Sequence, residues 1–272
     1  MIPSLVPWPA EVGLRQGALR LDVSEPRAVL ARARHARGDS PQEGYRLRID
    51  ADGIRIDAAT PAGAFYGERT LRQLVSRDAE GYFLPFVDIR DTPRFAHRGI
   101  MLDVARHFQS VEVVERLIER AADLKFNALH LHLTDDQAWR LALETHPELA
   151  RHGSATSIGG DAGGFYSVDD VRRIVTHAAR HHMVVVPEID LPGHTHAVGL
   201  SHPELVADPV LAPSVVEVVE RFGGGLPRAG APYTGLAVGF SSFDAHAPRL
   251  EEFLHEVFAE VASLFPGPYL HL

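Results

Sequence analysis

The sequence has no cysteine among its 272 residues, and lysine is almost as scarce, because Lys125 is the only one. The first absence excludes thiol nucleophiles, disulfides and thiolate metal sites. The second leaves little room for Schiff-base chemistry. There is also no Gly-Lys-Ser/Thr loop that could hold a triphosphate.

The sequence also lacks long apolar runs and an excess of basic over acidic residues. The longest apolar stretches, such as Met183–Pro187, are far shorter than the ~20 residues of a membrane helix. The start, MIPSLVPWPA, has no basic region and is interrupted by prolines, so we expect no signal peptide and a cytoplasmic protein. The formal net charge of -9 argues against nucleic acid as a partner. We expect neither nucleic acid nor a membrane as a partner, and no cofactor.

The N-terminal residues 1–90 are predicted to form a small α+β domain. Residues 44–58 alternate apolar and polar side chains around Asp52-Gly53, which predicts a β-hairpin with a tight turn. Pro61–Val75 opens with proline in a first-turn position and places its leucines on one face, which predicts a helix covering that sheet.

A second domain is predicted for residues 91–272. Phe86–Arg98 mixes Pro, Asp and Arg, which is typical of a connection rather than of a strand or helix interior, so we place a boundary near Asp91. Beyond it, strands and helices alternate. The predicted strands are Arg98–Val104, Ala128–Leu133, Met183–Asp190 and one starting at Pro268; the predicted helices follow Ser110, begin at the Ser167/Asp170 capping box and span Leu250–Leu264.

This alternation predicts a parallel sheet, in either an open doubly wound fold or a (β/α)8 barrel. Polar residues follow successive strands, at the rim where both architectures place active sites. Consecutive strands that all supply one site favour the barrel. Because so few parallel strands cannot close a barrel, we predict an α/β protein with the N-terminal α+β domain followed by the first half of a (β/α)8 TIM barrel.

Two clusters of ionisable side chains follow predicted strands. In HLTDDQAW, Asp135 and Asp136 are adjacent carboxylates, which are costly to bury unless they are paired; alternatively, one caps the next segment and the other is solvated. In PEIDLPGHTH, Glu188 and Asp190 share a strand face, and Pro-Gly returns His194 toward the same rim. That combination suits proton relay, although Glu188 could instead pair inside the barrel and His194 could cap a loop.

Arg106 and two histidines allow further interpretations. Arg106 follows a strand and could donate to sugar hydroxyls or a carboxylate, although a lone arginine is usually a surface residue. His130 and His132 share one strand face, as at the start of some zinc sites, with Asp135 or His194 as further ligands. The alternative is that both histidines are hydrogen-bonded core residues.

Several motifs together resemble family-20 glycoside hydrolases, the β-N-acetylhexosaminidases. The resemblance lies in the order and spacing of HRGIMLDVARHF, NALHLHLTDDQAWR, GGFYSVDDVRRIV, VVPEIDLPGHTHA and FPGPYLHL, and GAFYGERTLRQL is similar to the end of the domain that precedes the barrel. It implies hydrolysis of terminal non-reducing N-acetylglucosamine or N-acetylgalactosamine from glycans by substrate-assisted, retaining catalysis.

The resemblance also implies roles for individual residues. Arg106 would hold the 3- and 4-hydroxyls of the terminal sugar. Asp135 and His194 would form a relay to the catalytic Glu, and Asp190 would hydrogen-bond the Asp that orients the acetamido group. Arg98 is similar to a scaffold residue of the family.

In the family, a run like Tyr269–Leu272 is followed by Gly-Gly-Asp-Glu, and this sequence stops at Leu272. The resemblance therefore implies truncation just before the acid Glu and the orienting Asp, and an inactive 272-residue chain. The alternatives are a non-catalytic remnant that binds sugar weakly, and a metal-dependent barrel hydrolase built on His130 and His132. A half-barrel exposes strand edges and apolar faces, so we also expect self-association.

Overall fold

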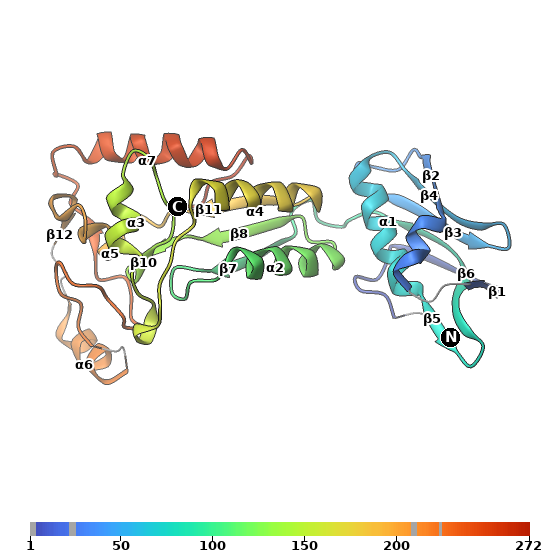
Figure 1. Ribbon diagram of the computed structural model, residues 1–272, viewed down its shortest axis with the longest axis horizontal. Coiled ribbons are helices and arrows are strands. Elements are labelled where there is room, and N and C mark those ends of the chain that lie inside the picture. The colour runs from blue at the N-terminus through green and yellow to red at the C-terminus, as the bar shows by residue number, and fades with distance from the viewer. Residues whose placement is uncertain (1–3, 22–25, 208–210, 223–224) are drawn as a thin grey trace. The chain divides into compact units, whose positions relative to one another are not determined.

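The structure is a computed structural model, and it describes residues 4–21, 26–207, 211–222 and 225–272. The chain separates into two compact units (Figure 1). The first unit comprises residues 1–98 and 120–126, and the second comprises residues 99–119 and 127–272. Within the described ranges, no helix combines the length and the apolar character that crossing a membrane requires.

The first unit is a β-sheet that packs against one α-helix. Its elements are β1 (Glu11–Leu21), the 3-10 helix η1 (Pro26–Arg32), β2 (Ala33–Arg37), β3 (Tyr45–Asp50), β4 (Gly53–Ala58), α1 (Pro61–Leu74), β5 (Ser76–Asp78) and β6 (Gly81–Asp91). The strand order is β1-β6-β3-β4-β2, and β5 pairs with β6. Only the β2–β4 pairing is parallel among these strands. The predicted hairpin and the predicted helix are both confirmed as β3–β4 and α1.

The prediction that Phe86–Arg98 is a connection is wrong for its first half. Residues up to Asp91 belong to β6, which lies between β1 and β3 in the sheet. Val87 and Ile89 point into the core and are almost fully buried. Asp88 accepts two hydrogen bonds from Arg46 on β3, at 2.8 and 2.6 Å. The charged residues thus alternate with core residues along an antiparallel strand, a period that the composition of the stretch obscured.

Lys125 is a buried structural residue of the first unit. Its Nζ donates to the Tyr45 hydroxyl at 2.9 Å and to the Asp91 carboxylate at 2.8 Å. Burial lowers the pKa of Lys125, and the neighbouring Asp91 charge opposes this shift. The side chain is only 5% exposed, so the single lysine holds residues 120–126 to the sheet instead of facing a substrate.

The second unit contains a parallel sheet with strand order β11-β8-β7, and the long helices α2, α4 and α7 (Figure 1). Its strands are β7 (Gly99–Asp103), β8 (Ala128–His132), β9 (Thr134–Asp135), β10 (Ala138–Trp139), β11 (Val184–Glu188), β12 (Val206–Ala207) and β13 (Ser242–Phe243). Its helices are α2 (Val111–Asp123, whose end joins the first unit), α3 (Pro147–Gly153), η2 (Ile158–Gly160), α4 (Val168–Arg180), α5 (His196–Gly199), η3 (Pro203–Leu205), α6 (Pro213–Phe222) and α7 (Leu250–Leu264).

Most predicted elements of this unit are confirmed. The parallel strands β7, β8 and β11 lie within the predicted stretches, and α7 has the predicted bounds. The capping box at the start of α4 is complete, with Ser167 accepting from the Asp170 backbone and Asp170 accepting from the Ser167 backbone. The predicted fourth strand forms only an isolated parallel bridge, between Glu188 and His271.

Candidate active site

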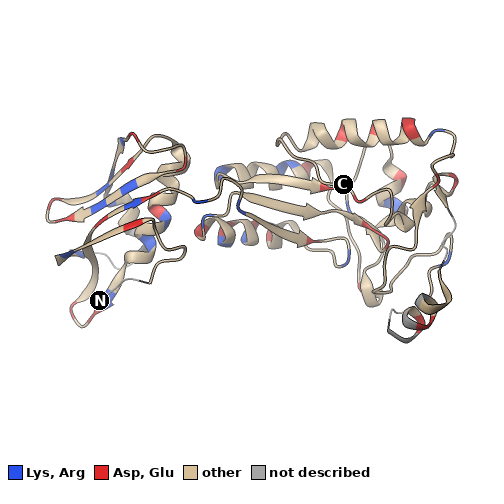
Figure 2. Ribbon diagram, turned by 180° about the vertical axis from the view of Figure 1, so that it is seen from behind, with Lys and Arg blue, Asp and Glu red and all other residues tan. Residues whose placement is uncertain are grey.

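The site lies where the parallel strands end, and the ribbon in Figure 2 has the red colour of Asp and Glu near these ends. β7, β8 and β11 run in the same direction, so their carboxyl ends lie along one edge. Asp103 is the last residue of β7, Asp135 closes the short β9 just after β8, and Asp190 lies two residues beyond β11. This edge therefore brings carboxylates from distant parts of the sequence together, as the sequence predicts.

Asp135 is the centre of the cluster and is completely buried. Its Oδ2 lies 2.6 Å from Nη2 of Arg106, and its Oδ1 lies 2.9 Å from Nδ1 of His194. The Asp135 Oδ1 also accepts from the Asp136 backbone N–H at 2.6 Å. A buried carboxylate requires such partners, so the buried position of Asp135 depends on both Arg106 and His194.

Arg106 is held between two carboxylates. Besides Asp135, its Nη1 donates to Asp103 Oδ2 at 2.5 Å, and its backbone N–H donates to Asp103 Oδ1 at 3.0 Å. Burial alone would raise the pKa of Asp103, but the interactions with His132 and Arg106 outweigh burial and hold it well below its usual range. Asp103 was not predicted as a site residue, although a carboxylate three residues before Arg106, at the end of a predicted strand, is the signal that could have identified it.

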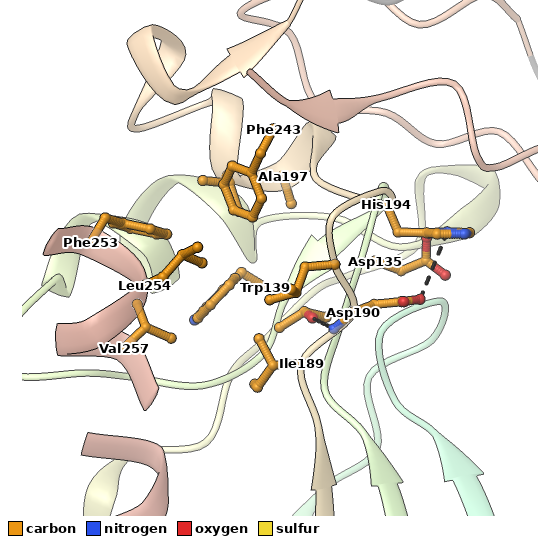
Figure 3. Close-up of a pocket in the computed structure, with 13 residues that line it drawn as sticks. Asp135, Trp139, Ile189, Asp190, His194, Ala197, Phe243, Phe253, Leu254 and Val257 are labelled. Atoms are coloured by element: carbon orange, nitrogen blue, oxygen red, sulfur yellow. Dashed lines mark hydrogen bonds and ion pairs between the residues drawn. The ribbon is translucent and has the colours of Figure 1, made fainter. Parts of the chain in front are cut away.

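His194 faces the same carboxylate from the loop after β11 (Figure 3). Its backbone is in the left-handed region, with φ 58°, which is uncommon for a residue with a side chain. Burial lowers the pKa of His194, but the hydrogen bond to Asp135 and the charges of Asp135 and Asp190 raise it more, so the pKa lies above its ordinary value. The imidazole is therefore poised to carry a proton beside Asp135.

Asp190 is nearby but makes looser contacts. Its Oδ2 lies 3.9 Å from His194 Nδ1 and 3.7 Å from His132 Nε2, and its backbone N–H donates to the Thr134 hydroxyl at 2.9 Å. Burial raises the pKa of Asp190, and the two histidines only partly oppose the shift. Asp190 thus retains oxygen atoms that can accept from a further donor.

His132 belongs to this polar cluster more than to a metal site. Its Nε2 lies 2.8 Å from the Thr134 carbonyl oxygen, and its Nδ1 lies 3.6 Å from Asp103. Burial lowers the pKa of His132, but the Asp103 carboxylate raises it more, so the net shift is upward. His132 thereby supports the carboxylate that holds Arg106.

Asp136 has a different task from Asp135. Its oxygens accept from the backbone N–H groups of His196 at 3.2 Å and Gly239 at 2.9 Å, and from the Ser241 hydroxyl. These contacts hold the segment before β13 against α5. Of the adjacent aspartates, one therefore serves the Arg106–His194 cluster and the other fixes a loop, and neither is solvated.

Arg140 positions the backbone around Arg106. The side chain is fully buried and donates to the carbonyl oxygens of Val104, Ala105, Ser154, Thr156 and Gly164 at 2.8 to 3.1 Å. Burial lowers the pKa of Arg140 to about 10, so the group stays charged at neutral pH. Arg140 ends a motif of the sequence, but no role was predicted for it, because nothing in the motif distinguishes a buried arginine from a surface one.

Glu188 pairs with His130, and His271 lies 3.5 Å from its other oxygen. This matches the alternative in which Glu188 is paired inside the barrel. Among the residues that the structure describes, no group with metal-ligand spacing contains both His130 and His132: the first joins Glu188 and His271, and the second joins Glu188 and Asp190. The geometry therefore gives no support to the metal-dependent hydrolase built on this pair.

An apolar pocket adjoins the polar cluster (Figure 3). Trp139, Ile189 and Phe243 line it together with Phe253, Leu254 and Val257 of α7, and Asp135, Asp190 and His194 border it. Trp139 is itself held, because its indole N–H donates to the Leu141 carbonyl at 2.7 Å. The side chains of Asp135, Asp190 and His194 thus contact a packed apolar surface. This surface lowers the local dielectric constant and strengthens the electrostatic interactions among the three side chains.

Comparison with known sequences identifies the family. Residues 95–272 match the catalytic domain of glycosyl hydrolase family 20, and residues 10–92 match domain 2 of the same family. The chain belongs to glycosyl hydrolase family 20. The resemblance that the strand-end motifs carried is thereby confirmed, as is the fold class, an α+β domain followed by part of a (β/α)8 barrel.

Similar proteins are β-N-acetylhexosaminidases, and the chain spans less than half the length of its curated relatives. It is 39% identical over 234 residues to a β-N-acetylhexosaminidase of Cellulomonas fimi, covering 85% of this chain and 43% of that protein. It is 37% identical over 240 residues to a β-hexosaminidase of Porphyromonas gingivalis, covering 85% of this chain and 29% of that protein.

Solved structures agree with the sequence comparisons. A family-20 β-N-acetylglucosaminidase superimposes with a TM-score of 0.92 at 47% identity, over 100% of this chain and 59% of that chain. A mutant Streptomyces plicatus β-hexosaminidase in complex with GlcNAc, its product, superimposes with a TM-score of 0.83 at 36% identity, over 100% of this chain and 60% of that chain.

Proposed function

We propose that the chain supplies part of the active site of a β-N-acetylhexosaminidase that removes terminal non-reducing N-acetylhexosamine from glycans. The observation that carries the proposal is the buried Asp135, which contacts Arg106 and His194 with its separate oxygens. The names of the relatives support the reaction, and the complex of the Streptomyces enzyme with GlcNAc supports an N-acetylglucosamine-terminated substrate. N-acetylgalactosamine is the second substrate that we propose to test.

Arg106 is proposed to bind hydroxyl groups of the terminal sugar. Its guanidinium is fixed by Asp103 and Asp135, yet 29% of the side chain is exposed. A guanidinium carries more N–H donors than these carboxylates use. The exposed part can therefore donate to a ligand without losing its anchoring contacts.

Asp135, His194 and Asp190 are proposed as supporting residues in a substrate-assisted, retaining mechanism. The substrate's acetamido oxygen would attack the anomeric carbon while a Glu protonates the leaving oxygen. Asp135 would hold His194 in the orientation and charge state needed for a relay to that Glu, and Asp190 would accept from the Asp that orients the acetamido group. Residues 1–272 contain no Asp-Glu dipeptide, so both partners would lie outside the 272 residues.

The test is hydrolysis of chromogenic aryl N-acetyl-β-glucosaminide and N-acetyl-β-galactosaminide. It compares residues 1–272 with a protein that has the full length of the relatives. We expect activity only in the longer protein, and Arg106→Lys should raise its KM because a lysine cannot form the same fork of donors. Activity in residues 1–272 alone would contradict the mechanism, because another carboxylate would then be the acid.

A further inference from the structure

A separate cluster of ligand-type side chains lies on α2 and α4, away from the strand-end site. His177 lies in the last turn of α4, His181 directly follows the helix end at Arg180, and Glu119 faces them from α2. One nitrogen or oxygen atom from each lies within 4.8 Å of the others. The two helices adjoin here, because Arg173 of α4 lies 2.7 Å from Glu115 of α2. The cluster therefore connects two elements that cover the parallel sheet.

His177 has an unsatisfied nitrogen that faces this cluster. Its Nε2 is buried and has no hydrogen-bond partner among the described residues. Glu119 Oε1 lies 3.6 Å from this nitrogen, which is too long for a hydrogen bond. Ligands of a tetrahedral zinc ion, at about 2.0–2.2 Å from the metal, are about 3.3 Å apart. The separation suits two ligands of one ion better than a direct bond.

His181 is already oriented in the manner of a metal ligand. Its Nδ1 lies 2.9 Å from the His177 carbonyl oxygen, and only a protonated Nδ1 can donate to a carbonyl. The lone pair of the neutral imidazole is then on Nε2. Metal-bound histidines commonly donate their other N–H to a carbonyl in this way. The rings of His177 and His181 lie 4.6 Å apart between centroids, so both reach the same space.

We propose that His177, His181 and Glu119 bind a divalent transition cation of the zinc type, with water completing the coordination. Two imidazoles and one carboxylate favour zinc over magnesium or calcium, which prefer oxygen ligands alone. Glu115 Oε1 lies 3.9 Å from His177 Nδ1, and Arg173 holds Glu115 in place and offsets its charge. The ion would link α2 to the end of α4 and stabilise the second unit without taking part in catalysis.

Calorimetric titration of the full-length protein with zinc chloride at about pH 7.5, where imidazole is neutral, tests the proposal. We expect one zinc ion per chain at this site and a melting temperature that rises with zinc. His177→Gln and His181→Gln should each weaken binding by more than about tenfold, the lower range for loss of even an outer partner. Glu119→Gln should weaken it less, because water can replace an exposed carboxylate.

The matched control is His152→Gln. His152 also lies one turn from a carboxylate on a helix, at 2.8 Å from Glu148, but it belongs to no group with metal-ligand spacing among the described residues. The His152→Gln variant should therefore bind zinc as tightly as the unaltered protein. Melting curves in EDTA show whether each variant folds without metal. The proposal is overturned if the unaltered protein binds no zinc, or if binding survives unchanged in both His177→Gln and His181→Gln.

Discussion

The Asp135 carboxylate is shared between Arg106 and His194: one oxygen lies 2.6 Å from the Arg106 guanidinium and the other lies 2.9 Å from the His194 ring. Arg106 lies in the loop that follows β7, and His194 lies in the loop that follows β11. A fully buried carboxylate cannot give up either partner without a large desolvation penalty. The sugar binding proposed for Arg106 and the proton relay proposed for His194 are therefore expected to depend on one another.

Asp135→Asn should lower kcat by about 10²-fold or more, the lower range for loss of a proton-transfer group. The amide keeps the shape but removes the charge that holds both neighbours. Steady-state hydrolysis of the aryl N-acetyl-β-glucosaminide by the full-length protein measures the change. The control is Asp52→Asn in the exposed hairpin turn of the first unit, which should leave kcat unchanged. Equal rates in the two variants would contradict the relay.

The pKa of His194 should fall toward its ordinary value of about 6.5 when Asp135 is replaced by Asn. In the unaltered protein this pKa is raised, so the charged imidazole stabilises the fold fully below about pH 6.5, and the stabilisation disappears as the pH rises through the raised pKa. NMR titration measures the pKa directly. His194→Gln should cost stability at about pH 6 and very little at high pH. A cost independent of pH would indicate a purely steric role.

Arg140→Leu should destabilise the protein by at least about 3 kcal/mol, because several buried carbonyls each lose a donor at about 1–3 kcal/mol. Chemical denaturation measures the loss. The matched control is Arg172→Leu: Arg172 is 67% exposed and pairs with Asp169, so its removal should change stability by less than about 1 kcal/mol. If the two variants were equally stable, the Arg140 hydrogen bonds would contribute nothing to the fold.

Residues 1–272, produced alone, should self-associate. β7 pairs with β8 and has no other strand partner among the described residues, and Met101 on this edge strand is 55% exposed. Unpaired edges promote association, and a charge on the edge opposes it. Sedimentation velocity should show larger species that decrease in Met101→Lys. The control is Leu236→Lys, because Leu236 is also exposed but lies outside any strand. A monomer at all concentrations would show that the edge is harmless.

The sequence was sufficient to predict the hairpin, α1, the parallel strands and α7, because local period and capping signals determine these elements. It also predicted that Arg106, Asp135, Asp190 and His194 lie close together, since residues that follow parallel strands share one edge; their roles stay proposals. The short β9 and β10 were not predicted, and the strand predicted from Pro268 forms only the single bridge at His271. These features depend on long-range pairing that leaves no periodic signal.

Partners are harder to predict than positions. Asp135 and Asp136 are adjacent and identical in type, and only the fold shows that the first contacts Arg106 while the second holds the segment around Gly239. The role of Asp103 depends on a contact with Arg106 across a turn. The stretch that forms β6 was predicted to be a connection and not a strand in the middle of the sheet. Its Asp88 pairs with Arg46 of β3, and the sequence does not show that these two strands are neighbours.

The ring of carbonyls around Arg140 limits how the region can be altered. The guanidinium binds carbonyls from residues 104–105, just before Arg106, and from residues 154–164 in a loop distant in sequence. Any replacement of that loop, for instance to change which sugars reach the site, has to present carbonyls at the same places. Otherwise the exchange also disturbs the backbone before Arg106. Grafting a loop here would then alter the position of Arg106 itself, the residue proposed to bind the sugar.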